Sequence, residues 1–235
     1  MTKDEVMKEL ASYGDQNTKK VLMKHGAKEP FYGVKVQDLK KILKKTKKNY
    51  ELSLELYATG NSDAMYLAGL MADETKMTKA DLNRWVKEAY WSYLSEYTVP
   101  WVASESKYAI ELGLKWMDNK KEEIAAAGWS TIASYIALNE DENLDHEMID
   151  GLLDRVKNNI HEAQNRVRYV MNGFVIAVGC YYPPLTNKAK ELGETIGKVH
   201  VDAGGTACKV PFSPDYIQKV VDKGRVGKKR KSARC

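Results

Sequence analysis

The chain has 235 residues, 43% of them hydrophobic, and its 37 Lys or Arg outweigh its 32 Asp or Glu to give a net charge of +5. This is long and apolar enough to bury a substantial core, either as one domain or as a continuous repeat array. No run approaches the ~18 apolar residues of a membrane span. The three cysteines, Cys180, Cys208 and Cys235, lack metal-ligand spacing. We therefore expect a cytoplasmic protein with no membrane contact, no disulfide framework and no metal site.

Apolar residues return at three- and four-residue steps along nearly the whole chain, the spacing typical of amphipathic helices. The first stripes are Val6, Leu10 and Tyr13, then Val21 and Leu22, then Val36, Leu39, Ile42 and Leu43. The same spacing predicts further helices at about 50–59, 62–75, 78–94, 104–118, 121–138, 145–160, 162–181, 183–197 and 213–224.

Local signals support several of these helices. Thr78 with Asp81 three residues later resembles a capping box, and Ser213 before Pro214 is typical of a helix start. Residues 197–211 are instead rich in Gly and β-branched residues, so they predict an irregular loop or a short hairpin.

The pattern predicts an all-α protein. Roughly a dozen helices with short polar connections, each unable to bury its apolar face alone, favour antiparallel pairs stacked into a curved solenoid of about six pairs with a concave groove. A single compact bundle is the alternative architecture. We expect one domain over residues 1–222, followed by a basic tail over residues 223–235 that lacks apolar content and is therefore disordered.

Charge is sorted into blocks along the chain. Residues 1–48 carry 13 Lys or Arg against 6 Asp or Glu, residues 49–220 carry 17 against 25, and residues 221–235 carry 7 against 1. The basic ends contain Lys40, Lys41, Lys44, Lys45, Lys47 and Lys48, and Lys228, Lys229, Arg230 and Lys231. Such clusters attract a polyanion through its phosphates, so nucleic acid is the first partner to consider. The alternative is a solvated helix face and a soluble tail.

Six segments of the sequence, taken together and in chain order, are similar to segments of a known protein family. They are Phe31–Lys41, Ala58–Ala68, Asp81–Val86, Arg168–Phe174, Ile196–Asp202 and Thr206–Pro211. Their order resembles the HEAT-like-repeat DNA alkylation repair family, the AlkD-like proteins. The resemblance implies a solenoid of HEAT-like helix pairs whose concave, basic face holds duplex DNA. It also implies that glycosylase members remove positively charged alkylpurines without a metal or an organic cofactor.

The glycosylase members place a Trp, an Asp, an Arg and a second Trp at their active site. Trp91 matches the first Trp, but the Asp position falls on Ser95, the Arg position within residues 125–127 and the second Trp on Phe174. Ser95 cannot stabilise the positive sugar that forms when the base leaves. Glu96 is a possible replacement, but a neighbouring helical residue points ~100° away, so it would need a register shift. Otherwise Glu96 is an exposed carboxylate at a helix end.

The leading hypothesis is a DNA-binding protein that holds duplex, branched or distorted DNA in a basic groove and lacks standard glycosylase activity. The expected phosphate-binding residues are the six lysines at 40–48, Arg166, Arg168, Lys209 and the tail cations at 228–231. One alternative is an active 3-methyladenine or 7-methylguanine glycosylase that uses Trp91 and Glu96. The other is a protein-binding helical-repeat scaffold, which the acidic middle of the chain suggests. We expect a monomer.

Overall fold

The structure, a computed structural model, describes residues 1–204, 206 and 208–234. Within these residues the regular secondary structure is entirely helical, which confirms the predicted all-α class. The α-helices are α1 (Lys3–Ser12), α2 (Gln16–Lys24), α3 (Val36–Thr46), α4 (Tyr50–Tyr57), α5 (Ser62–Met71), α6 (Lys79–Glu88), α7 (Val99–Glu105), α8 (Ala109–Met117), α9 (Glu122–Leu138), α10 (His146–Asn159), α11 (Asn165–Tyr181), α12 (Thr186–Ile196) and α13 (Ser213–Asp222).

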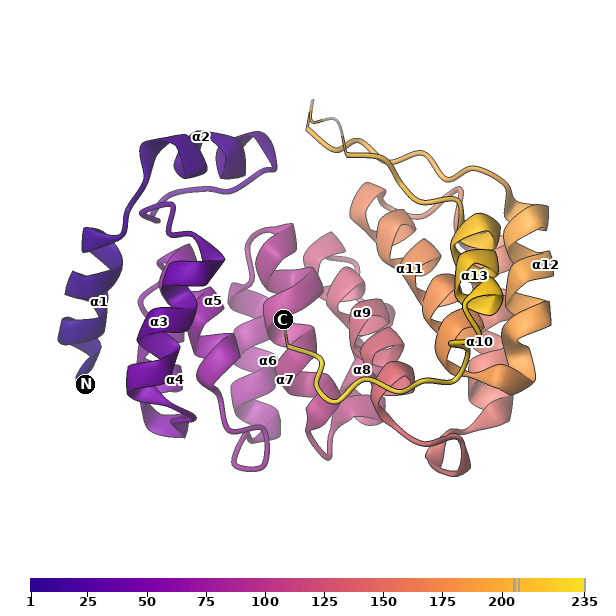
Figure 1. Ribbon diagram of the computed structural model, residues 1–235, viewed down its shortest axis with the longest axis horizontal. Coiled ribbons are helices and arrows are strands. Elements are labelled where there is room, and N and C mark those ends of the chain that lie inside the picture. The colour runs from indigo at the N-terminus through magenta and orange to yellow at the C-terminus, as the bar shows by residue number, and fades with distance from the viewer. Residues whose placement is uncertain (205, 207, 235) are drawn as a thin grey trace.

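The helices follow one another along an arc that runs from α1 to α12 (Figure 1). Successive helices pack as pairs, such as α4 with α5, α8 with α9 and α11 with α12, and α9 also packs against α11. This confirms the predicted curved stack, so the alternative of a single compact bundle is wrong. None of the helices in the described part of the chain has the length and apolar character needed to cross a bilayer.

Two clusters of buried side chains follow the arc. The first extends from Val6 on α1 to Ala127 on α9, and the second from Met117 on α8 to Ile217 on α13. Helices α8 and α9 therefore join the two halves of the core. They cross closely at Gly128, where an added Cβ would lie 2.5 Å from the amide nitrogen of Met117.

The predicted start signals have different outcomes. At α6 the capping box is confirmed, because Thr78 Oγ1 accepts from the Asp81 amide at 3.1 Å and an Asp81 carboxylate oxygen accepts from the Thr78 amide at 3.0 Å. Helix α13 begins at Ser213 itself, and Phe212 is its N-cap without a side-chain bond. Pro214 lies in the first turn, as expected.

The segment between α6 and α8 departs from the predicted helices at 78–94 and 104–118. Helix α6 ends at Glu88, and a π-helical turn, η1 (Leu94–Thr98), leads directly into α7. The Val99 amide donates to the Leu94 carbonyl, five residues back, so this turn contains one residue more than an α-helical turn. A π turn inside an otherwise α-helical pattern often marks a functional site.

The sequence predicted a disordered tail over residues 223–235, of which residue 235 lies outside the described residues. Residues 223–234, which we call the C-terminal strap, contact the folded helices at several points. The strap leaves α13 and runs back across the ends of α11 and α9 (Figure 1). The Gly227 amide donates to the Cys180 carbonyl at 2.9 Å, and the Arg230 amide donates to the Ala137 carbonyl at 2.8 Å. Both carbonyls belong to the last turn of a helix.

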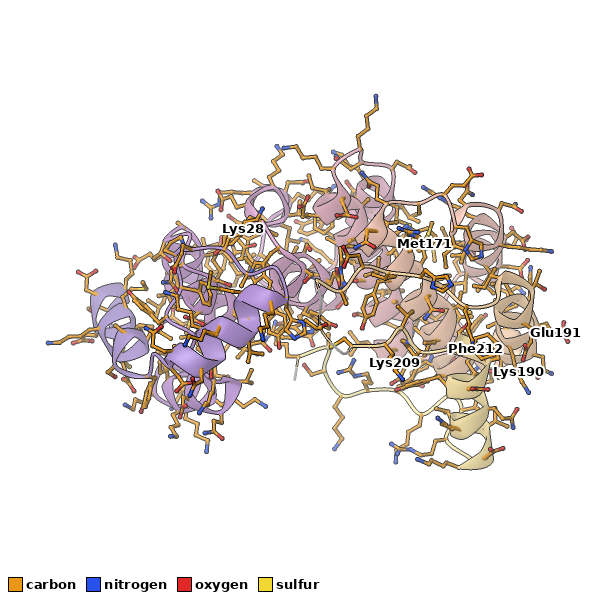
Figure 2. All side chains as sticks on the ribbon, turned by 90° about the horizontal axis from the view of Figure 1, so that it is seen from above. Lys28, Met171, Lys190, Glu191, Lys209 and Phe212 are labelled. Atoms are coloured by element: carbon orange, nitrogen blue, oxygen red, sulfur yellow. The ribbon has the colours of Figure 1, made fainter. Side chains whose placement is uncertain are left out.

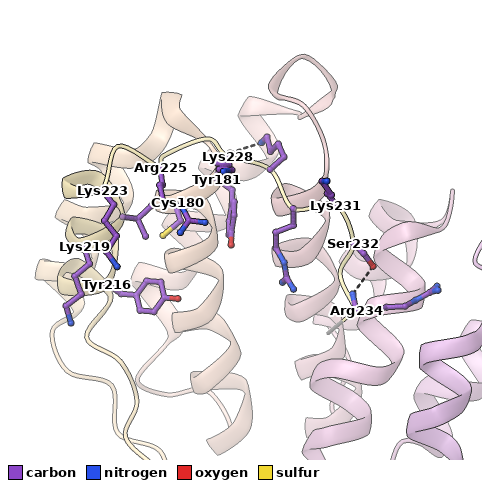
Figure 3. A pocket seen from close by; sticks show the side chains of 13 residues that line it. Cys180, Tyr181, Tyr216, Lys219, Lys223, Arg225, Lys228, Lys231, Ser232 and Arg234 are labelled. Carbon is purple, nitrogen blue, oxygen red and sulfur yellow. Dashed lines mark hydrogen bonds between the residues drawn. The ribbon is translucent and has the colours of Figure 1, made fainter. Parts of the chain in front are cut away.

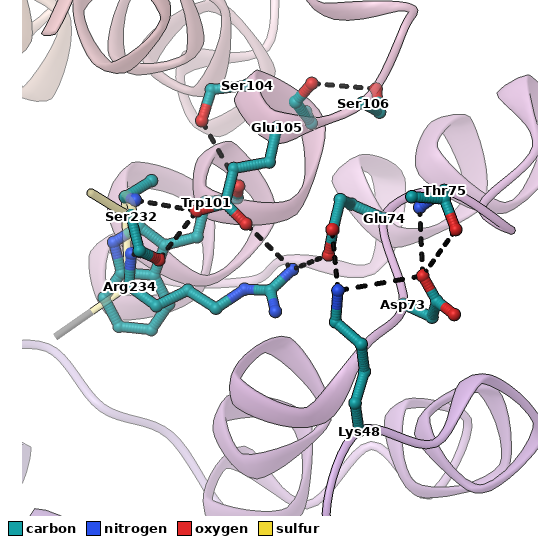
Figure 4. A network of polar contacts seen from close by, with 12 residues as sticks. Lys48, Asp73, Glu74, Thr75, Trp101, Ser104, Glu105, Ser106, Ser232 and Arg234 are labelled. Carbon is teal, nitrogen blue, oxygen red and sulfur yellow. Dashed lines mark hydrogen bonds and ion pairs between the residues drawn. The ribbon is translucent and has the colours of Figure 1, made fainter. Parts of the chain in front are cut away.

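The far end of the strap is fixed in the first half of the molecule (Figure 4). Ser232 Oγ and the Ala233 amide each donate to Glu105 at 2.7 Å. Arg234 pairs with Glu74 at 2.8 Å and with Glu105 at 3.2 Å. Ala233 is buried in the first core cluster, so the strap joins both halves.

The cause of this order is the alignment of the helix ends. The last carbonyls of a helix lack intrahelical donors and carry partial negative charge, which favours cations. Lys229 Nζ donates to Tyr181 O at the end of α11 at 2.6 Å and to Ile136 O near the end of α9 at 3.2 Å. It also pairs with Asp141 at 2.8 Å. Composition alone contains no information about such partners.

The sequence predicted either an irregular loop or a short hairpin over residues 197–211. In its described residues the connection between α12 and α13 is an irregular loop. The Asn165 side chain fixes it by donating to Asp202 O at 2.9 Å and accepting from the Asp202 amide at 2.7 Å. Near its tip the loop approaches α2, because a Cβ on Gly204 would lie 2.5 Å from the carbonyl oxygen of Lys24.

The close crossing of α8 and α9 generates a stability prediction. Gly128→Ala places a methyl group against backbone atoms of α8, and we expect it to destabilise the fold by about 1–3 kcal/mol. Gly151→Ala is the matched control, because Gly151 lies in α10 with nothing within 4 Å of an added Cβ. There we expect a gain of up to about 1 kcal/mol from helix propensity. Urea unfolding of both variants measures the difference, and equal stabilities would contradict the assigned crossing.

Candidate functional site

The lysines at 40–48 lie on the last turns of α3 and just beyond it, and half of them are paired with carboxylates. Lys41 pairs with Asp38 at 2.7 Å, Lys45 with Glu9 at 2.6 Å and Lys48 with Glu74 at 2.6 Å. The exposed members without an ion pair in the described structure are Lys40, Lys44 and Lys47. The structure does not bring this cluster together with Arg166 and Arg168. Lys48 lines a cavity together with the predicted cations Arg230 and Lys231. It also shares the carboxylate of Glu74 with Arg234 (Figure 4).

Two other predicted residues, Arg166 and Lys209, line one cavity of about 650 Å³. We call it the aromatic pocket. It lies between α2, the segment 90–97, the N-terminal ends of α9 and α11, and the loop 197–212. Seen from above, Lys209 lies toward the inner side of the arc, and Lys190 and Glu191 of α12 lie at its far end (Figure 2). Arg168 does not line this pocket, and its buried Nε has no partner in the described structure.

Stacked rings form one wall of the aromatic pocket. Trp91 and Tyr93 have ring centroids 5.0 Å apart and planes 8° from parallel. Tyr93 also contacts Tyr97, whose ring centroid lies 5.7 Å away. Trp91 is held in place because its Nε1 donates to Ser62 Oγ at 2.8 Å. Such faces can stack on a base or attract a cation.

Glu96 is not the exposed carboxylate that its place at a helix end suggested. It belongs to the π turn η1 and is 5% exposed. Its two carboxylate oxygens accept from Nε and from a terminal nitrogen of Arg166 on α11, both at 2.6 Å. Ser95, at the position of the catalytic Asp, is also buried, and its hydroxyl donates to Trp91 O at 3.3 Å.

The electrostatics of the pair follow from its burial. Burial raises the pKa of Glu96, and the bonds and charge of Arg166 oppose that shift. Burial alone would lower the pKa of Arg166, but Glu96 outweighs it and the net shift is upward. Both oxygens of Glu96 thus accept from Arg166, and separating a buried pair of this kind is costly.

Two further carboxylates, Glu122 and Glu123, lie in the first turn of α9. Glu122 accepts from the Arg166 backbone amide at 2.7 Å, so it caps α11. Glu123 lines the aromatic pocket with no hydrogen bond or ion pair in the described structure. Only the packing of α9 beside α11 places them here, and their spacing along the chain carries no such signal.

The remaining family positions belong to the core. Phe174, at the second Trp position, is fully buried and makes an edge contact with Trp129 at 5.3 Å between centroids. Residues 125–127 are buried alanines on α9. These positions therefore contribute packing here, and the aromatic groups of the pocket come from the segment 90–97 and from α11.

A curved stack of helix pairs is the architecture of helical-repeat proteins, and this chain adds an aromatic pocket to it. The family model described as "DNA alkylation repair enzyme" matches residues 6–190. The chain belongs to this family.

Three relatives are similar over almost their full length. "Uncharacterized protein Lin0241" of Listeria innocua is 35% identical over 93% of this chain and 97% of that protein. "Uncharacterized protein Lmo0209" of Listeria monocytogenes is 34% identical with the same coverage. A solved structure superposes with a TM-score of 0.92 and 39% identity over 100% of both chains. It is described as "a new family of proteins related to the HEAT-like repeat DNA glycosylases with affinity for branched DNA structures".

The pair of Glu96 and Arg166 generates a second prediction. Arg166→Met leaves a buried carboxylate without its partner and should destabilise the fold by roughly 3 kcal/mol. This is the lower end of the range for buried pairs, because the Arg166 side chain is 26% exposed. Arg168→Met, on the same helix, removes a guanidinium that makes no ion pair in the described structure and should cost much less.

The loss of folding stability in the Arg166→Met variant should depend on pH. Without Arg166, burial raises the pKa of Glu96 further in the folded state than in the wild type. A raised folded-state pKa gives stability at low pH that is lost as pH rises from the unfolded-state value to the folded one. The deficit measured by urea unfolding should therefore be smaller at pH 5 than at pH 7.5. An equal deficit at both values would show that Glu96 is not the group left unpaired.

Proposed function

We propose that this protein binds branched or distorted DNA on its concave face and does not cleave the glycosidic bond by the standard mechanism. The absence of standard glycosidic-bond cleavage is inferred from the residues at and beside the family's catalytic Asp position. Ser95 has no charge to offer, and both oxygens of Glu96 are bound by Arg166. The stacked rings beside them remain suited to holding a base without cutting it.

The binding part of the proposal rests on the pocket and on the relatives. The aromatic pocket combines ring faces with the cations Lys28 and Lys209, while the charge of Arg166 is paired with Glu96. Unstacked bases at a branch or a distortion can stack on aromatic rings, while cations neutralise the adjacent phosphates. The similar solved structure is described as having affinity for branched DNA, which supports the same ligand for this chain.

Binding to DNA is tested by fluorescence anisotropy with linear duplex, bubble and three-way junction DNA of equal length. We expect the junction to bind most tightly and its affinity to fall steeply with salt. If six phosphates are neutralised, the logarithm of the association constant has a slope of about −5 against the logarithm of the salt concentration. A flat salt response, or no binding to any of the three probes, would defeat the proposal.

One observation favours an active glycosylase as the second candidate. Glu123 lines the aromatic pocket on the side of α9, and nothing in the described structure neutralises it. A free carboxylate beside aromatic faces is the combination that stabilises a departing cationic base and a positive sugar.

A base-release assay separates the two candidates. We expect DNA containing 7-methylguanine or 3-methyladenine to release no base above the protein-free background, in the wild type and in Glu96→Gln alike. Release by the wild type that Glu123→Gln abolishes, with junction binding retained, would instead establish the glycosylase. Release abolished by Glu96→Gln alone would show that Arg166 does not hold that carboxylate during the reaction.

A further inference from the structure

A second cavity, of about 680 Å³, lies between the strap, α13 and the end of α11 (Figure 3). We call it the strap cavity. Eight of its thirteen lining residues are cations, and none of those described is acidic. They are Lys219, Lys223, Arg225, Lys228, Lys229, Arg230, Lys231 and Arg234.

These cations have two different roles. Lys229 and Arg234 are largely enclosed, with side chains 9% and 13% exposed, and they hold the strap to helix ends and carboxylates. Lys223, Lys228 and Lys231 are exposed, and no bond or ion pair of the described structure uses their amines. The anchored strap thus holds three unpaired positive charges along the wall of the strap cavity.

Residues between the strap cavity and the aromatic pocket line a further cavity. A third cavity, of about 300 Å³, shares Tyr97 and Tyr169 with the aromatic pocket. It shares Tyr216 and Arg230 with the strap cavity. The aromatic pocket lies at the N-terminal end of α11 and the strap cavity at its C-terminal end. A helix of 17 residues separates them by about 25 Å.

Crowding so many like charges around one hollow raises the free energy of the folded state unless a counter-charge enters. The hollow is open and basic, and it lies at the opposite end of α11 from a pocket suited to bases, an arrangement that fits a nucleic-acid backbone better than a small anion. We propose that the outward face of the strap is a second phosphate-binding surface, and that it takes the backbone of a DNA segment whose branch point lies at the aromatic pocket. This inference rests on the proposed DNA binding and adds a separate set of contacts to it.

The test is the triple variant Lys223→Gln, Lys228→Gln and Lys231→Gln in the full chain. These substitutions leave the anchors Lys229 and Arg234 in place. The matched control is Lys76→Gln, Lys87→Gln and Lys115→Gln, which removes the same charge from exposed lysines that do not line the cavity. Thermal unfolding by circular dichroism verifies that both variants keep the wild-type melting temperature.

Affinity for a three-way DNA junction is then measured by anisotropy over a range of salt. The strap variant should bind about tenfold more weakly at low salt, and its salt slope should be shallower by about 2 to 3, as expected for three lost phosphate contacts. The control should keep the wild-type slope to within about 1.

The outcomes separate the two proposals. If the wild type binds no DNA, the proposed function fails. If it binds the junction and the strap variant matches it in affinity and slope, only the strap surface is wrong. Polyglutamate serves as a second probe. A strap variant that loses polyglutamate binding while keeping the junction would assign the surface to acidic protein segments and overturn the inference.

Discussion

The carboxylate of Glu96 is buried, and its partner of opposite charge comes from a helix 70 residues away in the sequence. The bond to Arg166 joins the π turn before α7 to the start of α11, and so fixes the two walls of the aromatic pocket relative to each other. It also binds the one acidic group next to the family's catalytic position. A single ion pair therefore connects the two walls of the pocket and occupies the carboxylate beside the family's catalytic position.

Helices α9 and α11 run in the same direction, from the aromatic pocket to the strap. Helices α9 and α11 begin at the aromatic pocket, where Glu122 caps α11, and they end at the strap, where Lys229 contacts their last carbonyls. Opposite ends of the same helices thus present opposite partial charges. The C-terminal ends of α9 and α11 carry partial negative charge and bind Lys229 of the strap. Other cations of the strap stay exposed, so this edge of the molecule presents a basic surface to solvent.

Much of the fold was predictable, because helical periodicity and capping are local properties. The all-α class, the curved stack and the capping box at Thr78 followed from spacing alone. The π turn did not, since an added residue in one turn leaves no local signature. Glu96 and Glu123 were misjudged or missed because their surroundings come from distant helices. The contacts of the strap could not be predicted for the same reason, because its partners are helix ends that composition does not reveal.

The tip of the loop after α12 meets the end of α2 at Gly204, whose backbone lies in the left-handed region. No other residue type fits there, because any Cβ would collide with the Lys24 carbonyl. Residues from the start and from near the end of the chain therefore contact each other beside the aromatic pocket, and both contribute side chains to its lining.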